Sequence, residues 1–255
     1  MFKRVIPLNA AEHQSLRIKL IPNWSFALSQ TVFPIAMHEI GELARAFPIV
    51  FLKGQSLPFV LCGLQKGVNA YVGPDGRWLA PCIPSVLGMY PLSMSRIQGR
   101  DDEMVVVLDP DAPHLSDFQG SALFENGQPS EWLNQRISLL KQRLQSEARA
   151  KQATQAIVAA GLLADLSIRF SDTDPGEGGL SGLQMVDEKR LQSLFEHDLF
   201  ALHQKGALAL IYAHLVSLGN LRQRPLAVQR THSAGDSPGG AWADSLKGLD
   251  LGFSV

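Results

Sequence analysis

Residues 34–92 hold the densest alternation of short apolar segments and turn-forming residues in the chain, which restricts the possible folds more than any other feature. The run from Ile49 to Leu52 is too short for a helix, so it indicates a buried strand. The segment 73–76, Gly-Pro-Asp-Gly, is a turn, because proline presets φ and glycine permits positive φ. Short strands joined by tight turns pair antiparallel. The strands expected in this stretch are residues 49–52, 58–64, 69–72 and 77–80.

The segment before these strands, residues 34–47, has the apolar spacing of an α-helix. Pro34 suits a first helical turn, where its missing N–H costs nothing, and Pro48 disfavours helical geometry at the residue before it. We therefore expect a core helix here. Its apolar face consists of Ala36, Ile40, Leu43, Ala44 and Phe47.

Outside this stretch the pattern predicts further strands and a helical C-terminal part. Residues 133–160 carry two apolar stripes at helical spacing, and they form either one long helix after Ser130 or two helices with a kink. Asp187 is expected to cap a short helix, and Gly206 to interrupt a helix at residues 198–218. Together these elements predict an α+β fold, with an antiparallel sheet covered by helices. The further strands are residues 4–8, 16–20, 104–108, 121–124, 165–170 and 183–186.

The chain is expected to form one domain over residues 1–225, sheet-rich up to residue 129 and helical from residue 130, followed by a tail at residues 226–255. Residues 230–240 are rich in Ser, Gly and Pro and are typical of a linker. A purely disordered tail rarely gathers many large apolar side chains, so we expect the segment after the linker to dock, either on this chain or on a second copy. Those side chains are Trp242, Leu246, Leu249, Leu251 and Phe253.

Composition excludes several classes of protein. The net charge of −1 gives no sign of a nucleic-acid-binding surface. There is no apolar run of 18 residues, and the N-terminal sequence lacks the apolar core of a signal peptide, so we expect a cytoplasmic protein without a membrane span. Cys62 and Cys82 both lie in apolar segments and are expected to be reduced core residues, with a disulfide or a redox pair as the alternative.

Three groups of polar residues contain side chains that occur in catalytic or metal sites. None of the three has the complete pattern of such a site. His38, Glu39 and Glu42 lie on the polar side of the predicted helix at residues 34–47. His38 and Glu42 have a spacing that two metal ligands could use, but no third ligand is evident, so this side is expected to face solvent. Asp109, Asp111 and His114 follow the strongest strand and suit either acid–base chemistry or an ordinary turn. Asp172, Asp174 and Glu177 lack the spacing of a calcium loop. We therefore expect no metal and no cofactor, and we assign no catalytic residue.

Two blocks of the chain resemble the SapC family, in the right order and over residues 3–225. The first block holds Pro48-Ile49-Val50-Phe51, Gly63-Leu64, Asn69, Asp75-Gly76-Arg77-Trp78, Ile83-Pro84 and Tyr90-Pro91. The second holds Gly182-Leu183, Val186-Asp187, Leu191, Leu194, Gly206-Ala207-Leu208, Ile211-Tyr212-Ala213-His214-Leu215 and Ser217-Leu218. The resemblance implies a bacterial accessory protein linked to surface (S-) layers, or to TonB-dependent receptors and tryptophan halogenases.

The function expected from this resemblance is non-catalytic binding of a protein partner, with a homo-oligomer also open. The alternative is an enzyme that acts on a small molecule or peptide. A pocket with convergent polar side chains would favour the enzyme, and a flat apolar patch would favour the binding protein. His214 lies on an apolar stripe, which is also typical of a hydrogen-bonded histidine at the core. The candidate binding residues are Asn69, Trp78, Tyr90, His214 and Trp242.

Overall fold

A five-stranded antiparallel sheet in the order β12-β13-β4-β5-β3 organises the larger of two apolar cores. The computed structural model describes residues 2–20, 23–97, 100–166, 168, 180, 182–223 and 225–226. The sheet unites strands from distant parts of the chain, because β4 pairs with β5 on one side and with β13 on the other. Its strands are β3 (Val32–Pro34), β4 (Ile49–Leu52), β5 (Pro58–Leu61), β12 (Leu163–Asp165) and β13 (Leu183–Val186).

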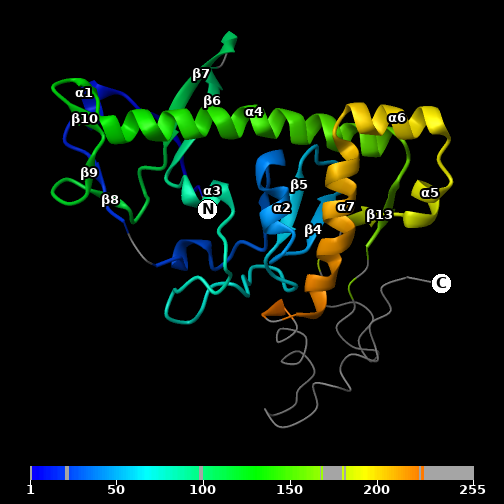
Figure 1. The fold of residues 1–255 in the computed structure, drawn as a ribbon. Helices are drawn as coiled ribbons and strands as arrows, with labels where there is room; N and C mark the ends of the chain where they lie inside the picture. Colours follow the sequence, from blue (N-terminus) through cyan, green and yellow to red (C-terminus); the bar gives the residue numbers. More distant parts are fainter. Residues whose placement is uncertain are drawn as a thin grey trace, which may run out of the picture.

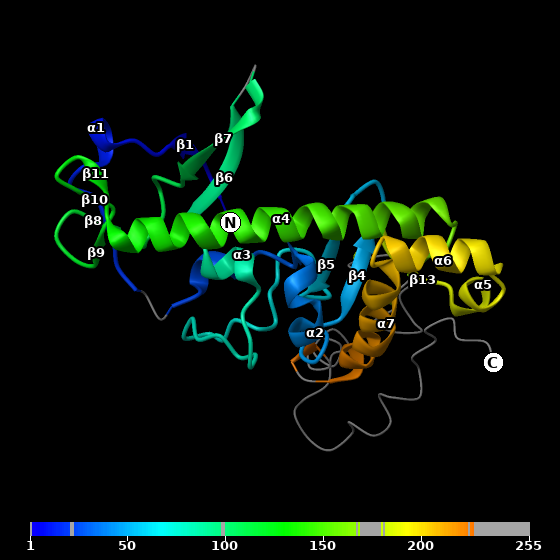
Figure 2. The ribbon, with the colours of Figure 1, turned by 45° about the horizontal axis from the view of Figure 1, so that its top comes forward.

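The central position of β4 in this sheet explains why the run from Ile49 to Leu52 is apolar at every position. Ile49, Val50 and Phe51 of β4 are all buried, so successive side chains are covered on both faces of the sheet. A strand covered on both faces needs apolar residues at every position rather than at alternate ones. Helix α7 (Ala207–Ser217) packs against β4 and β13 (Figure 2).

Smaller sheets surround a second core at the other end of the molecule. Asn126 and Gly127 have φ values of 51° and 77°, as a tight hairpin requires, and they join β10 to β11. The three-stranded sheets have the orders β1-β7-β6 and β8-β2-β9. These strands are β1 (Ile6–Pro7), β2 (Arg17–Ile18), β6 (Leu92–Ile97), β7 (Arg100–Leu108), β8 (Leu115–Ser116), β9 (Ser121–Ala122), β10 (Phe124–Glu125) and β11 (Gln128–Pro129).

One helix of 29 residues, α4 (Glu131–Ala159), crosses the whole molecule and contributes to both cores (Figure 1). Ser130 caps its start by accepting a hydrogen bond from the N–H of Leu133 at 3.1 Å. Gly161 follows its end with φ of 65°, a conformation that suits glycine. The first part of α4 adds Leu133 and Leu140 to the smaller core, and the last part adds Ala153 and Ile157 to the larger one. The chain therefore forms one long helix here and not two.

The C-terminal helices follow the predicted interruption. Gly206 has φ of 67° and separates α6 (Glu196–Gln204) from α7, while Asp187 caps α5 (Glu188–Gln192) through hydrogen bonds from two backbone N–H groups. The single-turn helix η3 (Leu218–Arg222) comes directly after α7. The other helices are short: α1 (Ala10–His13), η1 (Ser25–Ala27), η2 (Met37–Glu39), α2 (Ile40–Leu43) and α3 (Ser85–Gly88).

The predicted fold class is confirmed: antiparallel sheets are combined with helices, and the C-terminal part is largely helical. The predicted helix at residues 34–47 is wrong in its first half. Pro34 ends strand β3, and the backbone stays extended as far as Ala36, because the N–H of Ile35 bonds to the carbonyl of Pro58. Only η2 and α2 are helical, and Pro48 follows them as expected.

The predicted strands at residues 69–72 and 77–80 are also wrong. These segments meet only at one isolated bridge, between Val72 and Trp78. The side chain of Asn69 accepts a hydrogen bond from the N–H of Tyr71 at 2.9 Å, which folds the backbone into a turn. Other strands are shorter or displaced: the segments 4–8 and 16–20 keep two paired residues each, and the segment 121–124 is divided between β9 and β10. Residues 163–165 pair as β12, whereas residues 167, 169 and 170 of the predicted strand at 165–170 lie outside the described residues.

Residues 227–255 and most of the predicted loop at 171–182 lie outside the described residues. Within the described part, no single helix has the length and hydropathy needed to cross a membrane. Helix α6 and the segment Ala207–Arg222 meet those criteria only as a pair, and that pair is bent by 92°.

Candidate functional site

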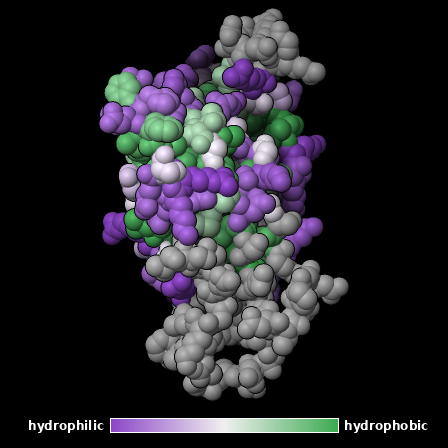
Figure 3. Space-filling model, turned by 90° about the vertical axis from the view of Figure 1, so that its right-hand side faces the viewer, coloured by the Kyte–Doolittle hydropathy of each residue, from purple (hydrophilic) through white to green (hydrophobic). Residues whose placement is uncertain are grey.

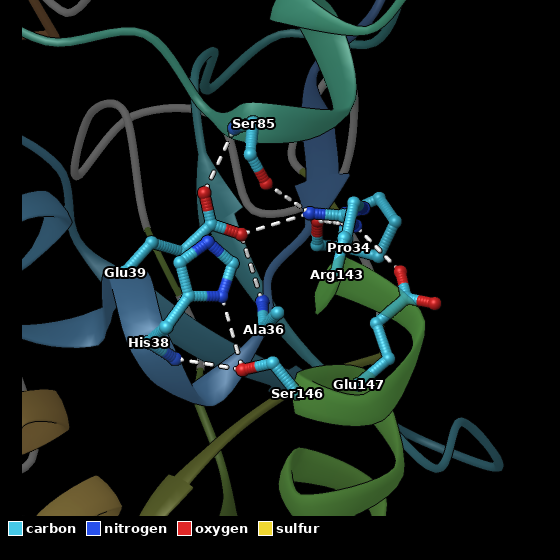
Figure 4. A network of polar contacts seen from close by, with 8 residues as sticks. All are labelled: Pro34, Ala36, His38, Glu39, Ser85, Arg143, Ser146 and Glu147. Carbon is cyan, nitrogen blue, oxygen red and sulfur yellow. Dashed lines mark hydrogen bonds and ion pairs between the residues drawn. The ribbon is translucent and has the colours of Figure 1, made fainter. Parts of the chain in front are cut away.

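The polar network drawn in Figure 4 lies where η2, α3 and α4 meet, and it centres on the buried Arg143. The Nη1 group of Arg143 donates to Oε1 of Glu39 at 2.9 Å, and Nη2 donates to Oε1 of Glu147 at 2.6 Å. Glu39 is as deeply buried as the arginine. The guanidinium therefore lies between two carboxylates, which is the arrangement a buried charge requires.

The same side chains also bind groups of two other segments, residues 34–36 and Ser85. Arg143 donates to the carbonyl of Pro34 at 3.2 Å and to the hydroxyl of Ser85. The carboxylate of Glu39 accepts the N–H groups of Ala36 and Ser85, each at 2.8 Å. The network thus fixes the end of β3, the start of α3 and the middle of α4 relative to one another.

Ser146 and His38 form a contact next to this network that resembles a nucleophile and its base. The Oγ of Ser146 lies 3.0 Å from Nδ1 of His38. However, Ser146 is buried within α4, where the helix takes up the neighbouring N–H groups, and its hydroxyl also accepts the backbone N–H of His38 at 2.9 Å. Among the described residues no side chain orients the other ring nitrogen of His38. The contact therefore ties η2 to α4.

A pocket of about 70 Å³ adjoins the network, with Arg143 and Glu147 on one side. Small-molecule sites typically measure roughly 300–1,000 Å³, so this volume suits a few water molecules rather than a metabolite. Its two charged groups already bond to each other. The other lining residues are mostly apolar: Phe2, Val86, Met89, Leu92, Ser93, Met94, Leu140 and Leu144.

A second polar cluster forms where β7 ends, and it unites Asp109 with Tyr90. The fully buried carboxylate of Asp109 accepts the O–H of Tyr90 at 3.1 Å and the N–H groups of Lys3 and Asp111. Burial and this hydrogen bond raise the pKa of Tyr90. The side chain of Asp111 turns away toward Arg4, at 3.7 Å. The sequence predicted Asp109 and Asp111 as members of one candidate site, but in the structure their carboxylates bind different partners.

His114 packs against this cluster without a hydrogen bond to it. Its ring lies edge-on to Tyr90 and Phe26, with centroid distances of 5.3 and 5.1 Å. Among the described residues, the buried Nδ1 atom of His114 has no hydrogen-bond partner. Burial, together with the positive charge of Lys19, lowers the pKa of His114. The imidazole is thus held in its neutral form next to a phenol and a carboxylate.

His214, one of the predicted binding residues, is fully buried in α7. Its Nε2 accepts the N–H of Val186 at 3.0 Å, so the proton lies on Nδ1, which donates to the carbonyl of Ile49 at 2.7 Å. Ser217, one turn later, receives the N–H of Ile49 at 2.7 Å. These bonds attach α7 to β4 and β13. A binding role for His214 stays a prediction, and its described contacts are all internal.

Three of the remaining predicted binding residues contact the segment from Trp24 to Ala27. Asn69 is buried, and its amide donates to the carbonyl of Ala27 at 3.2 Å. Trp78 is half-buried; its ring centroid lies 5.7 Å from that of Trp24, and its Nε1–H donates to the carbonyl of Cys82 at 2.8 Å. Tyr90 belongs to the Asp109 cluster and stacks on Phe26 at 4.7 Å, while Trp242 lies outside the described residues. The binding roles of all four stay predictions.

The cysteines are confirmed as free and buried. Burial raises the pKa of Cys62 and, with a smaller effect from Glu42, that of Cys82. Both thiols are therefore held in the unreactive protonated form. Among the residues that the structure describes, no three His, Cys, Asp or Glu side chains are grouped to hold a metal ion.

One of the exposed apolar regions of the described surface lies on α6 and the residue before it. Phe195 is 73% exposed, Phe200 is 59% exposed and Leu199 is 42% exposed. In the whole of α6 only Leu202 is buried. Figure 3 views the end of the molecule where α5 and α6 lie, and hydrophobic areas there alternate with hydrophilic ones. We call Phe195, Leu199 and Phe200 the α6 patch.

A family model described as SapC matches residues 8–223. The chain belongs to the SapC family. The match covers every described helix, from α1 through η3, and every described strand except β1, so SapC membership applies to nearly all of the described fold. No curated protein and no solved structure matches the chain.

The Arg143 network of this SapC chain was not predicted. Glu39 was expected on a solvent-facing side together with His38 and Glu42, but Glu39 is buried, and only the other two are exposed. A signal was present in α4, where Arg143 lies three residues after Leu140 and directly before Leu144, within the apolar stripe. A lone arginine on an apolar stripe indicates a buried partner, but the sequence alone does not name that partner.

Proposed function

We propose that this SapC chain is a non-catalytic binding protein that holds a protein partner on the α6 patch. The observation that carries the proposal is the exposure of Phe195, Leu199 and Phe200 within six residues of sequence. Large apolar side chains that remain in water at one place mark interaction sites. Aromatic residues also supply a large share of the binding energy at interfaces.

The polar clusters support a binding role rather than a catalytic one. The charged groups around Arg143 are bonded to each other, and the pocket beside them is too small for a metabolite. The hydroxyl of Ser146 accepts the backbone N–H of His38 and lies 3.0 Å from Nδ1 of the same residue. An apolar patch with closed polar clusters fits an accessory protein that acts by contact.

The family resemblance suggests which systems contain the partner. A SapC protein of this kind is proposed to serve an S-layer, TonB-receptor or tryptophan-halogenase system from the cytoplasm. The patch is flanked on α6 by Glu196, Asp198 and His203, so the partner should present an apolar centre with polar groups around it.

Affinity capture from the native host, with quantitative mass spectrometry, tests this proposal. Phe200→Glu places a charge in the patch and should reduce capture of the specific partner about ten-fold or more. The matched control is Phe118→Glu, because Phe118 is 89% exposed and lies in the loop between β8 and β9, at the opposite end of the molecule (Figure 1). Equal capture by both variants would refute a role for the patch.

A second candidate, an enzyme acting on a small molecule or peptide, is favoured by one observation. The unbonded Nδ1 of His114 lies beside the Tyr90–Asp109 pair, and a neutral imidazole with a free nitrogen can serve as a general base. Turnover of a metabolite by the purified protein that is lost in His114→Gln but kept in His203→Gln would favour this candidate. His203 is the control because it is exposed on α6.

A further inference from the structure

Helix α7 and the turn after it are apolar on every side. Residues 207–221 contain no Asp, Glu, Lys or Arg, and the single histidine among them, His214, is buried. A helix of this composition is normally covered on all of its faces, because an apolar surface in water is unfavourable. α7 covers the sheet with one face only, through residues such as Leu210 and Ile211.

The opposite face of α7 is uncovered. Val216 is 77% exposed and Tyr212 is 57% exposed, and they lie one helical turn apart. Ala209 and Gly219 extend this face in both directions, and Gly219 has open space where a side chain would be. Leu208 and Leu215 flank it and are half-buried. We call this surface the α7 stripe. It runs from Leu208 to Gly219, which lies eleven positions later, or about 16 Å along a helix.

The chain itself supplies a segment of matching size. Residues 227–255 lie outside the described residues, and in their sequence four of the five large apolar residues after the linker have helical spacing, while Leu251 does not fit it. Their positions are i, i+4, i+7 and i+11, which places them on one side of a helix of about 16 Å. The side chains are Trp242, Leu246, Leu249 and Phe253.

We propose that residues 241–255 of this chain cover the α7 stripe in cis. The last described residue, Leu226, is fully buried in the larger core and lies only ten residues after Val216, so the tail leaves the core close to the stripe. The sixteen residues from Leu226 to Trp242 reach about 50 Å when extended and average about 20 Å when flexible. The stripe thus lies within reach, and the tether provides a millimolar effective concentration that favours the chain's own segment over a second copy.

Limited proteolysis of the full chain tests this inference. Chymotrypsin cleavage after Trp242, followed by intact mass spectrometry, measures how often the segment leaves the stripe. Val216→Asp and Leu249→Asp should each raise the cleavage rate about ten-fold, and the double variant should be cleaved no faster than either single one. Val216 is largely exposed, so the change should leave the melting temperature of the domain almost unchanged. Val5→Asp is the matched control, since Val5 is 50% exposed near β1.

Three results would overturn the inference. Equal cleavage of the parent chain and Val216→Asp would show that the stripe does not hold the segment. Protection that rises with protein concentration, together with a dimer in light scattering, would place the segment on a second copy. Sedimentation with phosphatidylcholine–phosphatidylglycerol vesicles that Val216→Asp abolishes, without a change in cleavage, would assign the stripe to a lipid surface.

Discussion

Replacing His214 with glutamine is expected to remove a large part of the acid sensitivity of the fold. The ring is fully buried, and both nitrogens bond to backbone groups of neighbouring strands, the N–H of Val186 and the carbonyl of Ile49. A second proton on the ring would break the bond from Val186. Burial disfavours the charged ring and lowers the pKa of His214 from 6.5 to about 4, although the hydrogen bond to the carbonyl of Ile49 acts in the opposite direction.

The loss of stability in acid follows from the difference between the pKa of His214 in the unfolded chain and its pKa in the folded chain. Below pH 6.5 the unfolded chain takes up a proton at His214 while the folded chain does not, so acid favours unfolding. The stabilisation is fully present above pH 6.5 and is lost progressively down to about pH 4. The pKa difference corresponds to about 3 kcal/mol over that interval. At neutral pH, His214→Gln should cost about 1–3 kcal/mol, because Val186 or Ile49 loses its hydrogen-bond partner.

Urea denaturation followed by circular dichroism at several pH values from 7.5 to 4 measures this prediction. The unfolding free energy of the parent chain minus that of His214→Gln should start at about 1–3 kcal/mol at neutral pH and fall by about 3 kcal/mol toward pH 4, so that it reaches zero or changes sign. His203→Gln, on the exposed side of α6, should follow the parent chain. Both proteins keep His114, whose lowered pKa adds the same dependence to each. A difference that stays constant with pH would refute the argument from burial.

Two further predictions concern packing. Trp78→Ala should lower the melting temperature and reduce the unfolding free energy by about 3–5 kcal/mol, because the ring packs among aromatic residues and its N–H bonds to the carbonyl of Cys82. An unchanged melting temperature would instead leave Trp78 as a binding-site candidate. Arg143→Met should cost about 3–5 kcal/mol in urea denaturation, since Glu39 is left buried without its cation, and adding Glu39→Met should restore part of the loss. If the double variant is no more stable than Arg143→Met, the buried charge of Glu39 is not the cause.

The elements that the sequence predicted best are those whose local pattern and tertiary surroundings agree. The run Ile49–Leu52 is apolar at every position because β4 is central in its sheet. Ser130 and Gly161 mark the limits of α4 through capping and a positive φ, which are local effects. Gly206 separates α6 from α7 for the same reason.

The errors arise where distant residues determine the backbone. Pro34 has the local pattern of a helix start, but pairing with β5 keeps residues 32–34 extended. The charge on Glu39 suggested solvent, yet its partner Arg143 lies 104 residues later in the chain. The α6 patch was missed because exposure of Phe195 and Phe200 depends on what packs around them, which spacing alone does not reveal.

The pairing of β4 with β13 has a consequence for how the chain is made. Phe51 pairs with Gln184, so one edge of β4 stays unpaired until a segment 133 residues later in the chain has been synthesised. At a synthesis rate of about 5–20 residues per second, this delay is on the order of ten seconds. During that time a nascent chain offers the apolar edge of Ile49, Val50 and Phe51 to its surroundings. We therefore expect chaperones to bind the ribosome-bound chain until β13 has been synthesised and pairs with β4.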